Sequence, residues 1–163
     1  MKKTLLLFLA TAILTLPASM IAQTPRPAAG KDAARALDEA WAAAMKANDP
    51  EAVMRCYAAD AVAWLPDSPE ARGEAAIREA YRALFAANRI EDVKFSDARY
   101  ETAGDRSLAW GKFQLTLVPK ASGTPVTMSG RFSEMAEKRN GRWVYVLDHA
   151  SAEPAPAAAA PHN

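Results

Sequence analysis

The sequence predicts one α+β domain in which helices come first and an antiparallel sheet follows. Two observations predict it: apolar residues recur at helical spacing up to about residue 87, and strand-like runs separated by short turn segments follow. This order is typical of helices that pack on one face of an antiparallel sheet. A chain of 163 residues with a formal net charge of +1 fits a single domain and has no basic block for nucleic acid.

Both ends of the chain are predicted to lie outside the domain. Lys2 and Lys3 precede the apolar run TLLLFLATAILTL, and Pro17 follows it, which indicates a signal peptide over residues 1–22. The protein is therefore expected to be periplasmic or secreted, without a membrane span after cleavage. The cleavage site stays open, and an uncleaved anchor is the alternative. We interpret residues 23–31 as a linker, 32–151 as the domain and 152–163 as a disordered Pro/Ala tail.

Three helices are expected in the first part of the domain. The apolar residues at helical spacing in the first are Leu37, Trp41, Ala44 and Met45. In DPEAVMRCYAADA, Asp49 can cap a second helix that has Pro50 at its first position. The run AVAWL is a strand candidate, residues 66–73 are expected to form a loop, and GEAAIREAY begins a third helix that ends near Ala87.

Four strand-like runs follow the helices. They are residues 91–102, 106–119, 124–139 and 142–151, with AGD, KASG and NG between them. Asn140-Gly141 is the favoured pair for a tight type I′ turn. A two-residue turn places Ala136 opposite Tyr145 and then, in strict alternation, Phe132 opposite His149.

This register has consequences for the two faces of the last hairpin. Glu134 and His149 become diagonal neighbours on an aromatic-rich face, within reach of each other, and a one-residue slip would separate them. Asp148 falls on the opposite face. A homodimer interface is expected on that opposite face, built on Met135, Val144 and Val146.

Two stretches carry a family resemblance. AWAAAMKANDPEAVMRCYAADAVAWLPDSPEARGEAAIREAY and GRFSEMAEKRNGRWVYVLDHAS, in this order, resemble the nuclear transport factor 2-like superfamily, in particular its ketosteroid-isomerase-like and SnoaL-like branches. The resemblance spans residues 32–151. It implies a cone-shaped fold of three N-terminal helices packed in the concave face of a curved antiparallel sheet, with a pocket between them. It also implies dimerisation through the convex face.

When the catalytic residues of ketosteroid isomerases are matched one by one to this sequence, the resemblance implies that most of them are absent. The first-helix Tyr of ketosteroid isomerases matches Trp41, and their catalytic base matches Leu65, which has no proton chemistry. Asp67 substitutes for that base only if its loop turns inward. The late-strand acid falls at Glu134, or one residue earlier at Ser133. Other branches end in a pattern like LDHAS, which implies that His149 and Ser151 line the pocket.

The candidate catalytic pair is therefore Glu134 and His149. The candidate ligand-binding residues are Trp41, Tyr57, Trp64, Leu65, Tyr81, Phe113, Phe132 and Ser151. The alternative readings are a solvent-facing Glu134, a His149 hydrogen-bonded in the core, and aromatic residues that only fill the core. Cys56 is the only cysteine, so no internal disulfide forms and a buried thiol is expected. No cofactor or metal motif is present: GxSxG, HExxH and Gly-rich phosphate loops are all lacking.

Two functions remain open at this point. The first is an exported small-molecule-binding protein that performs acid–base, isomerase- or lyase-type chemistry on a hydrophobic substrate. The second is a noncatalytic ligand-binding or oligomerisation module of the same fold. A cone filled by Trp41, Trp64 and Trp143 would favour the second function, because it would leave no room for a substrate.

Overall fold

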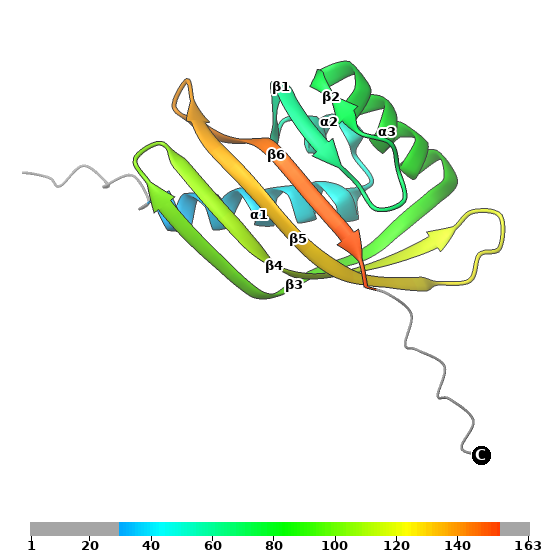
Figure 1. The fold of residues 1–163 in the computed structure, drawn as a ribbon. Helices are drawn as coiled ribbons and strands as arrows, with labels where there is room; N and C mark the ends of the chain where they lie inside the picture. The colour runs from blue at the N-terminus through cyan, green and yellow to red at the C-terminus, as the bar shows by residue number, and fades with distance from the viewer. Residues whose placement is uncertain (1–29, 154–163) are drawn as a thin grey trace, which may run out of the picture.

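The structure, a computed structural model, describes residues 30–153 (Figure 1). The predicted signal peptide, most of the linker and most of the Pro/Ala tail lie outside these residues. The first helix begins at Gly30, inside the segment expected to be a linker. Among the helices of residues 30–153, none is both long enough and apolar enough to cross a membrane.

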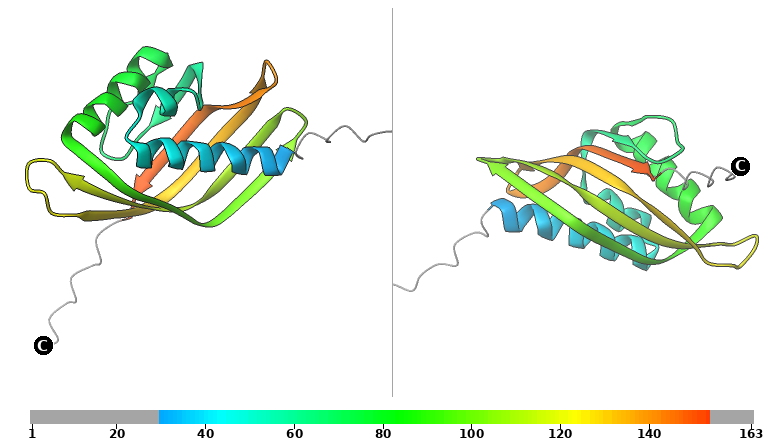
Figure 2. Two further views of the ribbon diagram at one scale, coloured as in Figure 1. Left: turned by 180° about the vertical axis from the view of Figure 1, so that it is seen from behind. Right: turned by 60° about the horizontal axis from the view of Figure 1, so that its bottom comes forward.

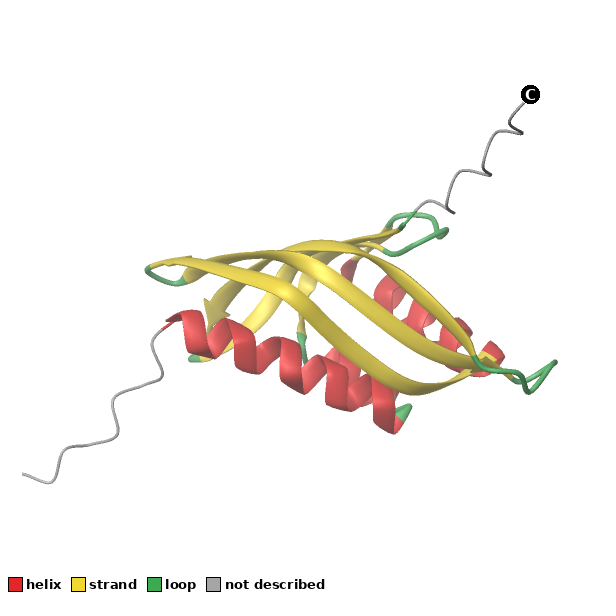
Figure 3. Cartoon of the chain, turned by 90° about the horizontal axis from the view of Figure 1, so that it is seen from below, coloured by secondary structure: helices red, strands yellow, loops and turns green. Residues whose placement is uncertain are grey.

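Three helices and one six-stranded sheet make up the domain. The elements are α1 (Gly30–Ala47), α2 (Pro50–Met54), β1 (Tyr57–Trp64), β2 (Ala71–Arg72), α3 (Gly73–Ala87), β3 (Asn88–Ala103), β4 (Arg106–Pro119), β5 (Val126–Arg139) and β6 (Arg142–Ala152). The strand order is β2-β1-β6-β5-β4-β3, and all neighbours are antiparallel except β1 and β6. The sheet curves over the helices, which all lie on its concave side (Figures 2 and 3). The predicted fold class is confirmed.

Helix α1 lies across the sheet, and its C-terminal end is attached to β3. Asn48, which follows the helix with φ 54°, accepts a hydrogen bond from the Ile90 N–H at 2.8 Å and donates one to the Ile90 carbonyl at 3.1 Å. An Asn tolerates this left-handed backbone conformation and supplies both hydrogen-bonding groups. The buried side of α1 is thereby fixed above the concave face.

The second helix is shorter than predicted. Asp49 caps it as expected, accepting from the N–H groups of Glu51 and Ala52 at 3.0 Å each, but the helix ends at Met54. Strand β1 begins at Tyr57, because the chain pairs there with Tyr145 of β6. Tertiary pairing thus overrides the helix propensity of the alanines that follow. The predicted loop also contains a two-residue strand, β2.

The β5–β6 hairpin decides which side chains enter the cone. Asn140 and Gly141 both have positive φ, 52° and 79°, as the predicted type I′ turn requires. Ala136 lies opposite Tyr145 as predicted, but Met135 then lies opposite Leu147, so Val146 is the extra residue of a β-bulge.

Beyond the bulge, every side chain of β6 changes face relative to the prediction. Asp148 lies beside Glu134 on the concave face, and His149 lies beside Ser133 on the convex face. The predicted Glu134–His149 pair is therefore wrong. The predicted interface is also wrong in part, since Val144 is only 4% exposed and belongs to the core, and Val146 packs against the core.

The core fills the space between the helices and the concave face. Ile77, Tyr81 and Phe85 of α3 and Met45 of α1 belong to it. Cys56 is buried beside it, as expected, and burial raises the pKa of its thiol to about 11. The thiol therefore stays protonated at neutral pH and is a poor nucleophile.

Candidate functional site

A cavity of about 480 Å³ opens between the concave face, α1, α3 and the loop that follows β1. Its wall is mostly apolar. The residues that line it include Trp41, Met45, Leu65, Tyr81, Leu84, Val93, Phe95, Phe113, Leu115, Met128 and Phe132. Cavities of this size and lining hold small organic ligands.

Two carboxyl groups lie side by side in this apolar wall. Glu134 of β5 and Asp148 of β6 are cross-strand partners on the concave face, and they are 6% and 8% exposed. Ala109 of β4 and Ala63 of β1 are their outer neighbours in the same row. Because these neighbours are small, both carboxyl groups keep access to the cavity.

A chain of hydrogen bonds ends on Asp148. Tyr57 donates its only hydrogen to Asp148 Oδ2. The Tyr57 and Tyr81 hydroxyl oxygens are 2.7 Å apart, so Tyr81 is the donor in that pair. The Trp41 indole N–H in turn donates to the Tyr81 oxygen at 3.1 Å. All three donors are therefore oriented towards the Asp148 carboxylate.

A second set of hydrogen bonds surrounds Asp38 of α1, which is 1% exposed. Tyr100 donates to its Oδ2 at 2.7 Å, and Tyr145 donates to its Oδ1 at 2.8 Å. Both oxygens of the Asp38 carboxyl group therefore accept a phenol hydrogen bond. The negative charge of Asp38 also raises the pKa of Glu134.

Burial changes the proton affinities of both cavity carboxyl groups. Burial raises the pKa of Asp148 to about 6, against the hydrogen bond from Tyr57, which lowers it. Burial, and then the hydrogen bond and negative charge of Asp38, raise the pKa of Glu134 well above its usual value. Both groups therefore keep a proton to higher pH than exposed carboxyl groups do, and each for a different combination of causes. Adjacent carboxyl groups with different proton states can act as distinct groups in acid–base chemistry.

The match to a family model decides the relationship of this chain to known proteins. The SnoaL-like domain model matches residues 39–146. The chain belongs to the SnoaL-like domain family. This family is part of the nuclear transport factor 2-like superfamily, as the resemblance implied. No curated protein sequence matches the chain.

Several solved structures share the fold of this SnoaL-like domain. A ketosteroid isomerase-like protein from Erwinia carotovora is 21% identical, with a TM-score of 0.68 over 76% of this chain and 97% of that one. A proposed calcium/calmodulin-dependent protein kinase II association domain from Xanthomonas campestris is 23% identical, with a TM-score of 0.68 over 76% and 87%. A proposed scytalone dehydratase from Novosphingobium aromaticivorans is 11% identical, with a TM-score of 0.69 over 76% and 83%. At these identities the likeness establishes the fold alone.

The SnoaL-like domain brings some of the predicted site residues together. Trp41, Leu65, Tyr81, Phe113, Phe132 and Glu134 all line the cavity. Tyr57 does not line it, but its hydroxyl lies behind the wall, between Tyr81 and Asp148. Asp67 is exposed on the loop and is not among the lining residues.

Three predicted residues lie outside the cavity because of the β-bulge and the loop geometry. His149 is on the convex face, with Nδ1 3.4 Å from the Ser133 hydroxyl and its ring 6.0 Å from the Trp64 ring. Ser151 is exposed and lies opposite Arg131. Trp64 is 43% exposed. The prediction that these three line the pocket is wrong.

Four polar residues of the site were not predicted from the sequence: Asp38, Tyr100, Tyr145 and Asp148. Helical spacing could have indicated Asp38, which lies four residues after Ala34 and three before Trp41. It therefore falls within the buried stripe of α1. A carboxylate in such a stripe needs buried donors. The inward position of Asp148 has no comparable signal, because it depends on the bulge at Val146.

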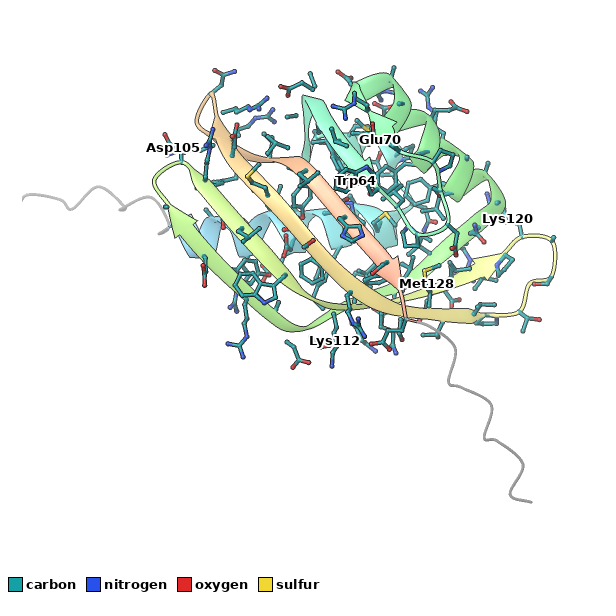
Figure 4. All side chains as sticks on the ribbon, in the orientation of Figure 1. Trp64, Glu70, Asp105, Lys112, Lys120 and Met128 are labelled. Atoms are coloured by element: carbon teal, nitrogen blue, oxygen red, sulfur yellow. The ribbon has the colours of Figure 1, made fainter. Side chains whose placement is uncertain are left out.

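The loop between β1 and β2 closes one side of the cavity. Leu65, Pro66, Ser68, Pro69 and Glu70 all contribute to the lining. Glu70 accepts hydrogen bonds from the Trp64 indole at 2.8 Å and from Arg72 at 3.1 Å (Figure 4). The loop is thus attached to the ends of both strands that it joins. In residues 30–153, no group of three or more His, Cys, Asp or Glu side chains is arranged to hold a metal ion.

Proposed function

We propose that this SnoaL-like domain binds an apolar small molecule in its cavity and catalyses a proton transfer on it without a cofactor, as an isomerase or lyase does. The observation that carries the proposal is the pair of adjacent buried carboxyl groups, Glu134 and Asp148, in an otherwise apolar wall. Such a wall excludes water and strengthens the interaction of a carboxylate with a bound ligand.

Asp148 is assigned the role of general base. With a pKa of about 6 it is ionised at neutral pH, yet it binds a proton more readily than an exposed carboxylate does. Tyr57 holds one of its oxygens, so the other oxygen is the one that receives the proton. The base of this domain thus stands on β6, whereas Leu65 occupies the position expected for the base of ketosteroid isomerases.

Glu134 is assigned the role of the neutral partner. While it is protonated, Glu134 holds the polar end of a ligand next to Asp148 and adds no second negative charge, and its raised pKa extends the pH range of that state. Asp38 raises the pKa of Glu134, and Tyr100 and Tyr145 hold Asp38 through hydrogen bonds. These three are positioning residues. His149 has no role in this proposal, because it lies on the convex face.

A noncatalytic binding module is the second candidate function. The sequence favoured this function if three tryptophan side chains filled the cone, and they do not. Trp41 is part of the cavity wall, Trp64 is outside the cavity, and Trp143 lines a separate groove against α1. Both candidates act outside the cytoplasm in our proposal, because the pattern of residues 1–22 is that of a signal peptide.

The test uses nitrobenzisoxazole, an aromatic carbon acid that reports on a base in an apolar site. Removal of its ring C–H proton forms a nitrile, breaks the N–O bond and releases a coloured cyanonitrophenolate, so no co-reactant is needed. We expect the second-order rate constant to rise with pH through a midpoint near the Asp148 pKa of about 6. Asp148→Asn is expected to lower it by about 100-fold.

Two variants serve as controls for this assay. Glu101→Gln removes an exposed carboxylate of β3 and is expected to leave the rate within about twofold of the parent. His149→Ala is expected to do the same. An Asp148→Asn protein that is as fast as the parent would contradict the proposed function.

A further inference from the structure

We infer that the cavity takes an apolar ligand whose polar end donates hydrogen bonds and carries no negative charge, either a hydroxyl group or a protonated amine. The inference names the ligand class of the proposed function and rests on it, since it concerns the same cavity. It follows from where the hydrogens of the lining side chains point and from the charges around them.

On the Asp148 side of the cavity, the O–H and N–H groups of the aromatic side chains already donate hydrogen bonds within the protein. Trp41 donates to Tyr81, Tyr81 to Tyr57, and Tyr57 to Asp148. A ligand that meets Tyr81 therefore finds an oxygen lone pair and no free hydrogen. The cavity presents acceptors on this side.

The same holds on the Glu134 side. Tyr145 donates its hydrogen to Asp38 at 2.8 Å and so has no free hydrogen for a ligand. At the rim, the Ser68 hydroxyl donates to the Pro66 carbonyl at 3.1 Å. The O–H and N–H groups of the lining Trp41, Ser68, Tyr81 and Tyr145 side chains therefore each have an acceptor inside the protein.

Free acceptor atoms remain at the cavity. Tyr57 occupies only Oδ2 of Asp148. Within residues 30–153, every fully buried side-chain oxygen or nitrogen has a hydrogen-bond partner, so Asp148 Oδ1, which has none, is in contact with the cavity space. The Glu134 carboxyl group, which lines the same cavity, supplies a second acceptor. A ligand must bring hydrogens to satisfy both.

The charges around the cavity favour the same ligand class. Among the described residues that line it, the ionisable side chains are Glu70, Tyr81, Glu134, Tyr145 and Asp148, with no Lys, Arg or His. None of the ion pairs in residues 30–153 involves Asp38, Glu134 or Asp148. Buried carboxylates normally have a cationic partner. A ligand carboxylate would add a further negative charge, whereas a ligand ammonium would supply the missing positive one.

The test compares four naphthalenes with the same ring position substituted: a naphthol, its methyl ether, a naphthylmethylammonium ion and a naphthoate. Affinities for the full chain are measured by calorimetry at about pH 8, where Asp148 is ionised. We expect the naphthol, the ammonium ion or both to bind about tenfold or more tightly than the methyl ether, and the naphthoate to bind most weakly. Whichever of the naphthol and the ammonium ion binds more tightly shows whether a hydroxyl group or a protonated amine is the preferred donor. A methyl ether or naphthoate that binds as tightly as both donor compounds would overturn the inference.

Variants assign the preference to the cavity. Asp148→Asn is expected to reduce the preference for the ammonium ion over the methyl ether by about tenfold, and Glu101→Gln is expected to leave it unchanged. Glu134→Gln keeps an acceptor towards the ligand and a donor towards Asp38, so it is expected to retain the order of affinities. A preference for the ammonium ion that is unchanged in Asp148→Asn would place the binding elsewhere and overturn the inference.

Failure of this inference and failure of the proposed function give different results. The calorimetry needs no turnover, and nitrobenzisoxazole has no hydrogen-bond donor. Donor compounds that bind in the expected order to a protein with no Asp148-dependent turnover would refute the catalysis and retain the ligand class. Asp148-dependent turnover with the opposite order of affinities would do the reverse.

Discussion

Burial of the Asp148 carboxyl group destabilises the fold and also gives this group the raised proton affinity that the proposed chemistry uses. The carboxyl group is buried, it has no Lys or Arg partner in residues 30–153, and the hydrogen bond from Tyr57 only partly offsets the effect of burial. The native state therefore binds a proton at Asp148 more tightly than the unfolded chain does. At neutral pH that proton is absent, and the buried charge lowers the free energy of unfolding.

We expect Asp148→Asn to stabilise the protein, and to do so more at high pH than at low pH. The pKa of Asp148 is raised from 3.8 to about 6, so its contribution to stability is fully present below pH 3.8 and is lost as the pH rises to about 6. The difference over this window is on the order of 3 kcal/mol for this single group. The Asn side chain still accepts from Tyr57 but does not titrate.

Thermal unfolding of both proteins across this pH range checks the prediction. The Tm of the Asn variant should exceed that of the parent at about pH 8, and the gap should shrink towards about pH 4. Glu101→Gln, at an exposed site, should show no such trend. A gap that is the same at both pH values would mean that Asp148 is not the buried titrating group described here.

At the scale of elements, local sequence signals account for most of the fold. Asp49 and Pro50 mark the start of α2, Asn140-Gly141 marks the last turn, and the four long strands lie where their apolar and β-branched residues predict them. The early end of α2 was not predictable, because β1 starts where the chain meets Tyr145 of β6, a contact distant in sequence.

The site was less predictable than the fold because one residue of register decides it. The bulge at Val146 has no marker such as a Gly, and it moves Asp148 into the cavity and His149 out of it. Glu134 lies on β5, the strand without the extra residue, so regular alternation from the Asn140-Gly141 turn predicted its inward position. The sequence therefore located one carboxyl group of the pair and missed the other.

The loop between β1 and β2 is expected to control exchange of the ligand. Trp64→Phe keeps the aromatic contact with His149 but removes the N–H that donates to Glu70. We expect the dissociation rate of a bound naphthol to rise by about threefold to tenfold with little change in Tm, because one exposed hydrogen bond is lost. Stopped-flow displacement measures this rate. An unchanged rate would show that the loop does not limit exit.

At the scale of the whole molecule, the convex face is the largest departure from an ordinary soluble surface. Leu108 is 48% exposed and Trp64 is 43% exposed, and cross-strand pairing places them in two adjacent rows with Trp110, Met135 and Leu147. Lys112 and Arg131 lie near one end of these rows, and Glu137 lies near the other. Glu137 is already paired with Arg106 and Arg139, so the match in a second copy rotated by half a turn would come from the apolar rows.

We expect the domain to form a homodimer through these rows, and Leu108→Glu to break it. Val126→Glu is the matched control, since Val126 is also 49% exposed but lies at the far end of β5. Sedimentation velocity at about 50 μM should give a dimer for the parent and for Val126→Glu, and a monomer for Leu108→Glu. A parent protein that sediments as a monomer would rule out the interface.

The central claim is that Glu134 and Asp148 hold different proton states beside one cavity. Carbon-13 NMR of the Asp and Glu side-chain carboxyl groups, titrated with pH and assigned with Asp148→Asn and Glu134→Gln, measures this directly. Asp148 should titrate near a pKa of about 6, and Glu134 should stay protonated well above its usual range. Exposed carboxyl groups titrate at roughly pH 4. If both groups did the same, the cavity would not separate their proton states, and the proposed base would have no raised proton affinity.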